Sequence, residues 1–570
     1  RVASAAPRFG PRLRSHPAAG ARGMATGMMG MMQHHDLTIA SLIEHAGSVY
    51  GDTEIVSRTI EDPSKFHTYT YADALKRSKQ LANALQKLGV GRNDRVATIA
   101  WNGYRHFEVY YGVSGMGAVL HTINPRLHPE QMTYIISHAE DKVLMVDLTF
   151  YKGATALLAA KLPTLKTLIV MTDRASMPAD APPSVLCYED LIGGESDSFA
   201  WPKVLEGEAA AMCYTSGTTG NPKGVLYSHR STVLHAWHMN SANGFGLCTR
   251  DTMLPVVPMF HVNAWGLPYA ACMAGCKVVF PGSAMDGPSI FDSLKQHSVN
   301  KSAGVPTVYG AVLQHMADTK ATLPDLEMII IGGSACPPSM IRAFDEHGVT
   351  AVHAWGMTEL SPTGVINAPR HGDNKKTYDE RFAVRTAQGR QMYGAELRCV
   401  DEAGNEVPRD GKTAGQLMVR GPWTCSGYYK LEKAAVDAEG WFDTGDVACM
   451  TKDGYLIITD RSKDMIKSGG EWISSIDVEN LATEHPSIAQ AACIGVPHPK
   501  WDERPVLIAV LTPGKPEPPK EEVLSLIAAK LHKMCVPDDV IFVKELPIGG
   551  TGKILKRELR EKYASHPLKP

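Results

Sequence analysis

The sequence lacks any long uninterrupted run of apolar residues. A helix that crosses a membrane needs about 20 consecutive apolar residues. The most apolar stretches, such as Leu267–Met273, are much shorter and are punctuated by other residue types. We therefore predict no transmembrane segment and interpret these stretches as buried core.

Paired cysteine motifs are also missing. The eleven cysteines are scattered and odd in number, and only Cys272 and Cys276 lie close together, without a His/Cys cluster beside them. This pattern argues against a disulfide framework and against a zinc site. It favours a reducing compartment, so we expect a cytoplasmic protein.

Charge of one sign is missing as well. The 58 Lys and Arg nearly balance the 60 Asp and Glu, which gives a formal charge of −2. Such a balance provides no general attraction to nucleic acid or to an anionic membrane. Neither is expected as a partner, and any polyanion must be bound by local Lys and Arg side chains.

The first 35 residues contain five arginines, many Ala and Gly, and no acidic residue before Asp36. An Arg-rich, acid-poor start is typical of a mitochondrial transit segment, which would place the protein in the matrix. It is equally consistent with an upstream extension, since Met24 is a plausible start, and we favour this second interpretation. In both cases we expect residues 1–35 to be disordered and outside the fold.

Helical and strand patterns alternate over residues 36–459. Apolar spacing predicts a helix over 71–88 that stops at Gly89. Short apolar strands are predicted at 95–100, 142–146, 168–171 and 328–331. Short buried strands between helices predict an α/β protein with largely parallel, helix-covered sheets in a large N-terminal domain.

The pattern changes after residue 460. Two helices, 477–484 and 521–532, alternate with strands at 491–496, 506–511 and 540–543. This is a small α+β domain over 468–570, close to the usual size of an independent core. The short polar stretch 460–467 before it is predicted to be a hinge.

The segment Tyr214–Gly224 is the most informative part of the chain, with three Gly, several Ser and Thr, and Lys223 directly after the apolar run Ala209–Cys213. Glycines let backbone N–H groups turn toward a ligand, and hydroxyls and a Lys charge suit a polyphosphate. The Walker A order is absent, and composition alone is equally consistent with a surface turn. The candidate ligands are Thr215, Ser216, Gly217, Thr218, Thr219, Gly220 and Lys223.

Further motifs follow in a specific order: Gly332–Pro337, Trp355–Glu359, Trp441–Asp446 and Pro547–Lys553. Together with Tyr214–Gly224 they resemble the adenylate-forming superfamily, especially bacterial acyl-CoA synthetases that act on fatty acids and on 3-(methylthio)propionate. The resemblance extends from about Thr38 to Arg560. It implies the fold of that superfamily, a large N-terminal domain and a small mobile C-terminal one.

The resemblance also implies roles for individual residues. Thr215 and Glu359 would hold a Mg²⁺ ion that bridges ATP phosphates, and a single carboxylate beside phosphates suits that ion. Asp446 and Arg461 would bind the ribose, Lys463 would be the hinge residue, and Lys553 would be the catalytic lysine. The other residues implied to bind ATP or AMP are Gly333, Ser334 and Ala335 of the adenine-contacting turn, Trp355, which would stack on adenine, and Gly356, Met357 and Thr358.

Two further segments are implied to meet the other substrates. Pro258–Gly266 and Gly304–Tyr309 would line the acyl pocket, with His261, Trp265, Val305 and Pro306 as the candidate residues. Ser468, Gly469 and Gly470 would meet the pantetheine arm of CoA. Lys500 and Arg504 are weaker candidates for the CoA phosphates, because surface cations are common.

The function expected from the resemblance is an AMP-forming acid–CoA ligase with ATP, CoA and a small carboxylic acid as substrates. The acid is expected to be a medium- or long-chain fatty acid, with 3-(methylthio)propionate as the alternative. A luciferase-like oxidation and adenylation for a carrier protein share the first half-reaction, and a catalytically inactive nucleotide sensor is a third alternative. A homodimer is expected by analogy with related enzymes.

Overall fold

The computed structural model describes residues 28, 30–160, 162–215, 221–468, 471–549 and 553–568. Residues 1–36 and 37–570 are two separate compact units, and the second contains the fold. The expectation of disorder for residues 1–35 falls almost wholly outside the described residues. In the described part, no helix combines the length and apolar character that a membrane span requires.

The first sheet of the fold has seven strands and is parallel except at one edge. Its interior strands are buried along most of their length, as expected for strands covered on both faces. At the edge, the antiparallel pair ends at Tyr214 and begins again at Gly224, so the glycine-rich segment joins two hydrogen-bonded strands. In spatial order the strands are β7 (Val185–Cys187), β6 (Thr167–Val170), β5 (Asp141–Val146), β3 (Arg95–Ile99), β4 (Val119–Thr122), β8 (Ala209–Tyr214) and β9 (Gly224–Ser228).

The second sheet has thirteen strands and changes character along its length. Six neighbouring strands are parallel, in the spatial order β14, β13, β12, β10, β11 and β1. At the edge, β2 pairs with β1 in the antiparallel sense. Those beyond β14 are antiparallel. In spatial order they are β17 (Glu396–Val400), β18 (Gly415–Arg420), β19 (Phe442–Met450), β20 (Tyr455–Arg461), β16 (Gly389–Gln391), β15 (Thr363–Ile366), β14 (Thr350–Gly356), β13 (Met328–Ile331), β12 (Lys301–Gly304), β10 (Thr252–Pro255), β11 (Lys277–Phe280), β1 (Glu54–Arg58) and β2 (Phe66–Thr70).

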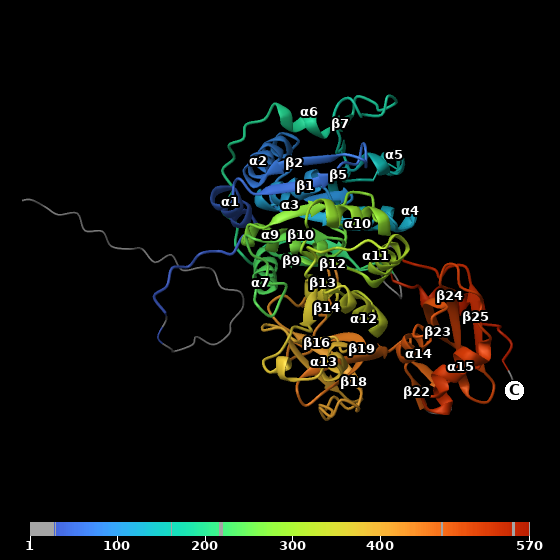
Figure 1. Ribbon diagram of the computed structural model, residues 1–570. Helices are drawn as coiled ribbons and strands as arrows, with labels where there is room; N and C mark the ends of the chain where they lie inside the picture. The colour runs from blue at the N-terminus through green and yellow to red at the C-terminus, as the bar shows by residue number, and fades with distance from the viewer. Residues whose placement is uncertain are drawn as a thin grey trace, which may run out of the picture. The chain divides into compact units, whose positions relative to one another are not determined.

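The third sheet belongs to the C-terminal part of the chain (Figure 1). Strand β24 (Asp502–Leu511) is its centre, and pairs with β23 (Ile488–His498), β25 (Asp539–Val543) and β21 (Ile466–Ser468), which in turn pairs with β22 (Glu471–Ile473). Sheet membership therefore changes between Arg461, the last residue of β20, and Ile466. A separate apolar core that includes Val478, Leu507 and Val540 supports this sheet.

Helices cover the sheets and supply most of the remaining core. Helix α2 shows the local logic: Thr70 and Asp73 form a reciprocal capping box at its start, and Gly89 follows its end with φ of +82°. The helices are α1 (Ile39–Val49), α2 (Tyr71–Lys87), α3 (Tyr104–Gly115), α4 (Pro129–Ala139), α5 (Tyr151–Ala159), α6 (Tyr188–Gly193), α7 (His229–Met239), α8 (Val262–Trp265), α9 (Leu267–Ala274), α10 (Gly287–Gln296), α11 (Pro306–Thr319), α12 (Pro338–Glu346), α13 (Tyr378–Arg385), α14 (Ser475–Ala482), α15 (Lys520–Ala528) and α16 (Lys556–Tyr563).

Two expectations from the sequence need correction. The sheets are not largely parallel past β14, because the chain there reverses between antiparallel neighbours, as in the short turn at Gly454, with positive φ, that joins β19 to β20. The helix expected over 521–532 ends at Ala528, because the His532 ring accepts a hydrogen bond from Met534 N and starts a separate 3₁₀ turn.

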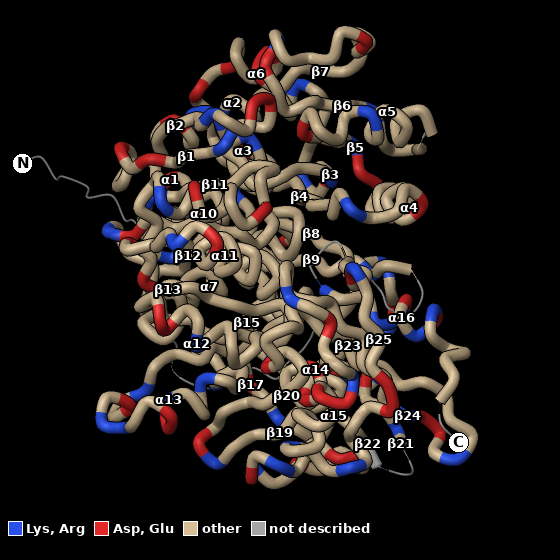
Figure 2. Tube along the Cα trace, turned by 45° about the vertical axis from the view of Figure 1, so that its right-hand side comes forward, with Lys and Arg blue, Asp and Glu red and all other residues tan. Residues whose placement is uncertain are grey.

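Charges of both signs are spread over the described part of the chain (Figure 2). Many are paired across elements, as in the half-buried group formed by Arg77, Arg105 and Glu189. This group ties α2, α3 and α6 together. Such pairs orient the elements that they join.

Candidate functional site

The carboxyl ends of β13 and β14 lie side by side, because the two strands are parallel neighbours. Strand β13 continues into Gly332–Gly333, where Gly333 has φ of +83°, and β14 continues into Trp355–Glu359. The edge formed by the carboxyl ends of parallel strands is the usual place for a ligand in α/β proteins. Two segments far apart in the sequence are thus brought to one edge.

Asp446 is a buried carboxylate at this edge and contacts two other predicted site residues. It is 4% exposed, accepts a hydrogen bond from Trp355 Nε1 at 2.9 Å, and lies 3.3 Å from Arg461 Nε. The register of β19 and β20 places Asp446 directly opposite Arg461. The predicted ribose pair and the predicted adenine residue are therefore one connected group.

Glu359 is held by a residue that the sequence motifs did not include. The Tyr428 hydroxyl donates a hydrogen bond to Glu359 Oε1 at 2.8 Å. The ring of Tyr428 also lies under Lys223, whose Nζ is 4.9 Å from the ring centroid. Tyr428 therefore connects the Glu359 carboxylate to the end of the glycine-rich segment. The aromatic run Tyr428–Tyr429 was the available signal, but nothing in the sequence distinguished it from core.

The described ends of the glycine-rich segment close on each other. Thr215 N donates to Lys223 O at 2.9 Å, and the backbone of Gly224 accepts from Tyr429 N at 2.8 Å. The Lys223 side chain is exposed, which leaves its charge available to a ligand. Ser216, Gly217, Thr218, Thr219 and Gly220 lie outside the described residues, so their predicted role as phosphate ligands stays a prediction.

Gly356 has a structural reason to be glycine. A Cβ at this position would lie 2.1 Å from the Pro362 carbonyl oxygen, because the backbone doubles back there. Thr358, two residues further on, is buried, and the Thr358 carbonyl accepts a hydrogen bond from the Tyr227 hydroxyl at 2.8 Å. The turn after β14 is thereby fixed, which positions Glu359. Met357 is half-buried, as is Ala335, whereas Ser334 is exposed.

Lys553 reaches this edge from the C-terminal part of the chain. Its Cε lies 4.0 Å from the point where Gly333 would carry a Cβ. A small hairpin presents it, with Gly549 N donating to Lys553 O at 2.7 Å and Leu555 N to Pro547 O at 2.8 Å. Burial and the neighbouring charge of Arg461 lower the pKa of Lys553 to about 8.

The segment Pro258–Gly266 contains an unusual backbone. Five consecutive residues, Val262 to Gly266, have φ between +46° and +72°. A β-branched valine in that region is an outlier, and such strain persists only where the surroundings impose it. The turn pushes Trp265 against the nucleotide edge: its indole Cη2 lies 3.1 Å from the Cβ position of Gly332.

The other predicted acyl-pocket residues lie around the same edge. Burial and the charge of Lys553 lower the pKa of His261 to about 3, so this ring is neutral. Val305 lies 3.3 Å from the Cβ position of Gly333, and Pro306 is the buried first residue of α11. Val305 also lines a cavity of about 280 Å³ together with Arg126, Phe260, Ile548 and Gly549, among others.

The stretch predicted as a hinge is anchored at its start. Asp460 is 1% exposed and accepts hydrogen bonds from both Ser475 N and Ser475 Oγ, so it binds the end of β20 to the start of α14. Lys463 lies between Arg461 and Asp464, and burial lowers its pKa. Asp464 pairs with Arg560 at 2.7 Å. Whether the chain rotates at Lys463 stays a prediction.

Ser468, which is predicted to meet CoA, belongs to β21 of the C-terminal sheet, away from Lys553 in sequence and in element. Ser468 is buried and its hydroxyl accepts from Arg504 at 3.1 Å, while Gly469 and Gly470 lie outside the described residues. The structure corrects the expectation that Arg504 meets the CoA phosphates. Its guanidinium is 9% exposed and donates to Asp538 and to the carbonyls of Met534 and Val536, so it is a structural cation rather than a surface phosphate ligand.

Comparisons with known proteins agree with this arrangement. Residues 43–429 match the AMP-binding enzyme family and residues 477–553 match the AMP-binding enzyme C-terminal domain. A medium-chain-fatty-acid–CoA ligase of Ectopseudomonas oleovorans is 48% identical over 94% of this chain and 98% of its own. A 3-methylmercaptopropionyl-CoA ligase of Ruegeria lacuscaerulensis is 47% identical over 94% of this chain and 99% of its own.

Solved structures show the same architecture. The anthranilate CoA ligase AuaEII in complex with anthranoyl-AMP superimposes with a TM-score of 0.81 at 25% identity, over 92% of this chain and 97% of that chain. ATP-bound MatB from Rhodopseudomonas palustris superimposes with a TM-score of 0.77 at 25% identity, over 92% and 99%. The family match spans most of the chain and the relatives match nearly all of it. This chain belongs to the AMP-binding enzyme family.

Proposed function

We propose that the protein is an ATP-dependent acid–CoA ligase. In the first half-reaction a carboxylate oxygen of the acid attacks the α-phosphorus of ATP, and pyrophosphate leaves. In the second, the thiol of CoA attacks the acyl carbonyl and AMP leaves with the electron pair of the broken C–O bond. The site provides no nucleophile of its own and needs none, because both nucleophiles are substrates.

The convergence of Lys553 on Asp446, Arg461 and Glu359 carries this proposal. A carboxylate and a phosphate repel each other, and a cation between them stabilises the charge that develops as they react. Lys553 supplies this cation from the C-terminal part, while Arg461 pairs with Asp446. Asp446 accepts hydrogen bonds from the ribose hydroxyls, and Trp355 stacks its ring on adenine. Names of relatives support the same chemistry, since each is a CoA ligase.

The residues present fit a Mg²⁺ ion. Glu359 is 9% exposed, only its Oε1 is engaged by Tyr428, and the Thr215 hydroxyl supplies a second hard oxygen. Mg²⁺ prefers few carboxylates with phosphate oxygens and water, so we propose that Glu359 and Thr215 hold it. When bound it supplies positive charge to the phosphates that leave.

We further propose that the C-terminal part, from residue 468 onward, moves relative to residues 36–459 between the half-reactions. Lys553 and Ser468 lie in different parts of this region: Lys553 reaches the edge, whereas Ser468 is buried in the C-terminal sheet. Rotation at residues 460–467, with Lys463 as the pivot, would move Lys553 away from the edge and bring Ser468 to it. The cavity of about 280 Å³ fits this scheme, because Ile548 and Gly549 form part of its wall and would open it to a thiol arm as they leave.

The proposal also specifies the class of acid that is the substrate. We expect a medium- or long-chain fatty acid or 3-(methylthio)propionate, in line with the relatives named above. One CH₂ group changes transfer free energy by only about 0.8 kcal/mol, so a few side chains decide the chain length. A panel of straight-chain acids and 3-(methylthio)propionate, assayed for AMP release with ATP, Mg²⁺ and CoA, tests the function. Failure of every acid would contradict it.

Asp446→Asn is expected to weaken AMP binding by about tenfold to a hundredfold, because it removes a charged acceptor of ribose hydrogen bonds. The amide retains an oxygen for Trp355 Nε1, so the fold should persist. Calorimetric titration with AMP measures the change. Asp443→Asn is the matched control: Asp443 is exposed, belongs to the same motif, and bonds Gln416 instead. Equal losses in both variants would contradict the assignment.

The first half-reaction is expected to slow above about pH 8. Only protonated Lys553 carries the stabilising charge, and its protonated fraction falls as pH rises through its lowered pKa. The measurement is kcat/KM for ATP in pyrophosphate exchange, because that parameter reports groups of the free enzyme. Lys553→Arg should flatten the alkaline limb, since guanidinium stays protonated. A wild-type profile that stays level to pH 10 (about two units higher) would contradict this prediction.

We also propose a cytoplasmic location and a homodimer. The eleven cysteines all lie in the described part of the chain and form no disulfide there, which suits a reducing compartment. Light scattering of the purified protein checks the dimer.

A further inference from the structure

Buried hydrogen bonds join the two sides of the stretch predicted as a hinge. Asp460 of β20 accepts hydrogen bonds from Ser475 N at 2.7 Å and from Ser475 Oγ at 2.5 Å. The carbonyl of Thr459, the residue before it, accepts from Ser474 Oγ at 2.7 Å. Asp460 is 1% exposed and Ser475 is fully buried. Three bonds therefore connect the strand before Lys463 to helix α14 after it.

Asp460 completes the N-terminal cap of α14. Ser475 is the first residue of this helix, so its backbone N–H has no partner within the helix. The Ser474 side chain serves a different donor, Asp477 N, at 3.1 Å. A carboxylate beside the first turn is also favoured by the partial positive charge at the start of a helix. The start of α14 thus depends on a residue of the strand before Lys463.

The bonds continue from Ser475 to the segment that carries Lys553. Ser475 Oγ accepts a hydrogen bond from Lys556 Nζ at 2.5 Å, and Lys556 pairs with Glu479 of α14 at 2.6 Å. Lys556 is the first residue of α16, and it follows Lys553 by three residues, directly after the hairpin. The bonded chain Asp460–Ser475–Lys556 therefore fixes the base of that hairpin to α14 and β20.

The other end of this bonded chain lies at the nucleotide edge. Asp460 precedes Arg461, which pairs with Asp446. Asp460 lies before Lys463 in the chain and Ser475 lies after it. A rotation at Lys463 that carries Lys553 away from the edge therefore separates Asp460 from Ser475, because hydrogen bonds do not persist over more than a few tenths of an ångström of added distance.

The charges of this group allow the bonds to break at a moderate cost. Two carboxylates, Asp460 and Glu479, share the single cation Lys556, and burial raises the pKa of both carboxyl groups. A buried carboxylate gains hydration when it reaches water. The hydration of Asp460 thus offsets part of the loss of its bonds, while Lys556 and Glu479 stay paired within the C-terminal part.

We propose that Asp460 and Ser475 are positioning residues that hold Lys553 at the nucleotide edge for the first half-reaction, and that separation of the two releases Lys553 for the second. The inference rests on the proposed function, including the rotation at Lys463. Asp460 and Ser475 act through Lys556 and the hairpin and need no contact with a substrate. Weaker bonds between them should favour the rotated arrangement.

The test measures the two half-reactions separately in Ser475→Ala, which removes the hydroxyl bonds and keeps the backbone bond to Asp460. The first rate is adenylate formation from acid and ATP in a single turnover, and the second is thioester formation from preformed acyl-AMP and CoA. Loss of one hydrogen bond to a charged group shifts an equilibrium about tenfold. We expect the ratio of the second rate to the first to rise about tenfold, with the second rate itself above that of the wild type.

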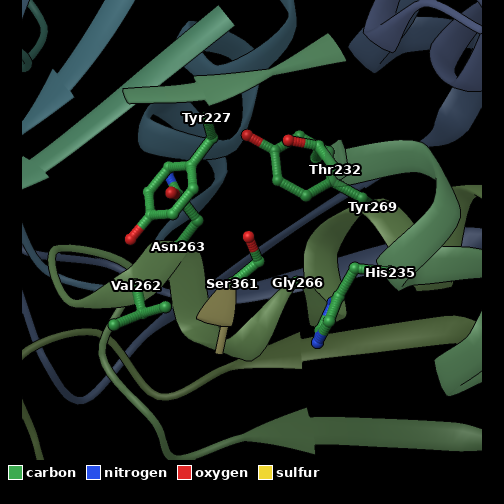
Figure 3. Close-up of a pocket in the computed structure, with 8 residues that line it drawn as sticks. All are labelled: Tyr227, Thr232, His235, Val262, Asn263, Gly266, Tyr269 and Ser361. Carbon is green, nitrogen blue, oxygen red and sulfur yellow. The ribbon is translucent and has the colours of Figure 1, made fainter. Parts of the chain in front are cut away.

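Two matched controls remove a hydroxyl bond on one side of the pivot only. Thr483→Val removes the bond from Thr483 Oγ1 to the Asn480 carbonyl at 2.9 Å, within the C-terminal part. Thr232→Val removes the bond from Thr232 Oγ1 to the Ser228 carbonyl at 3.0 Å, beside a small pocket formed by residues between 227 and 361 (Figure 3). Both variants should keep the wild-type ratio of the two rates.

Asp460→Asn is a second variant of the same contact, because it keeps the size of the side chain and replaces one acceptor by a donor. It should raise the ratio as well, and it gives the same comparison should Ser475→Ala unfold. A purely structural role predicts that both rates fall together. A second rate that stays at or below the wild-type value in both variants would overturn the inference. A wild-type enzyme that forms neither adenylate nor thioester with any acid would instead overturn the proposed function.

Discussion

Lys553→Ala is expected to lower the rate of adenylate formation by about a hundredfold to a thousandfold, the usual effect of removing one preorganised charge from a transition state. Lys553 adds a charge from the C-terminal part to the edge formed by Gly333, Asp446 and Glu359, where Arg461 already pairs with Asp446. Pyrophosphate exchange into ATP in the presence of acid measures this step. The second step should survive, because the thiol reaction needs no charge at that place.

Preformed acyl-AMP and CoA isolate the second step. The variant should convert them at nearly the wild-type rate. Lys544→Ala is the matched control, since Lys544 is an exposed lysine of the same C-terminal part, and both steps should be unchanged in it. If Lys553→Ala formed adenylate normally, or lost both steps equally, the assignment of Lys553 to the first step would be wrong.

Glu359→Gln is expected to lower AMP release by about a hundredfold or more, since metal charge on the phosphates contributes several kcal/mol to such transition states. Glutamine keeps an oxygen that can accept from Tyr428, so the change removes charge with little change of shape. The concentration of Mg²⁺ needed for half-maximal rate should rise in parallel. A steady-state titration with MgCl₂ at fixed ATP measures both effects.

Two further variants distinguish the effect of the Glu359 charge from the effect of its orientation. Tyr428→Phe removes the hydrogen bond that orients Glu359 and should give a smaller loss of the same kind, about tenfold. Glu346→Gln neutralises an exposed glutamate at the end of α12 and should change neither parameter. A Glu359→Gln enzyme with unchanged rate and unchanged Mg²⁺ requirement would remove Glu359 from the metal site.

Local patterns were enough to predict much of the fold. Strand β13 has the bounds expected from its four apolar residues, and α2 stops where Gly89 permits a left-handed residue. The antiparallel half of the thirteen-stranded sheet was not predicted, because polar residues such as Gln416, Asp443 and Asp446 interrupt the apolar residues of β18 and β19. These strands have no continuous apolar run, and pairing across the sheet decides their structure.

The sequence predicted the motifs of the site but not how they contact one another. Asp446, Arg461 and Trp355 were expected from resemblance, and the structure shows that Asp446 accepts a hydrogen bond from Trp355 and forms an ion pair with Arg461. Tyr428 and the anchor Asp460 were not expected, because each acts through a partner distant in sequence. The left-handed turn before Gly266 leaves no trace in residue order, since it arises from tertiary packing.

Isotope transfer from the acid tests the central claim most directly. An acid labelled with the heavy oxygen isotope in both carboxyl oxygens should give one labelled oxygen in AMP and one in the thioester, because the carboxylate itself attacks the α-phosphorus. Mass spectrometry of the AMP reads this out in a single turnover. AMP without label, or label in the pyrophosphate, would contradict the account.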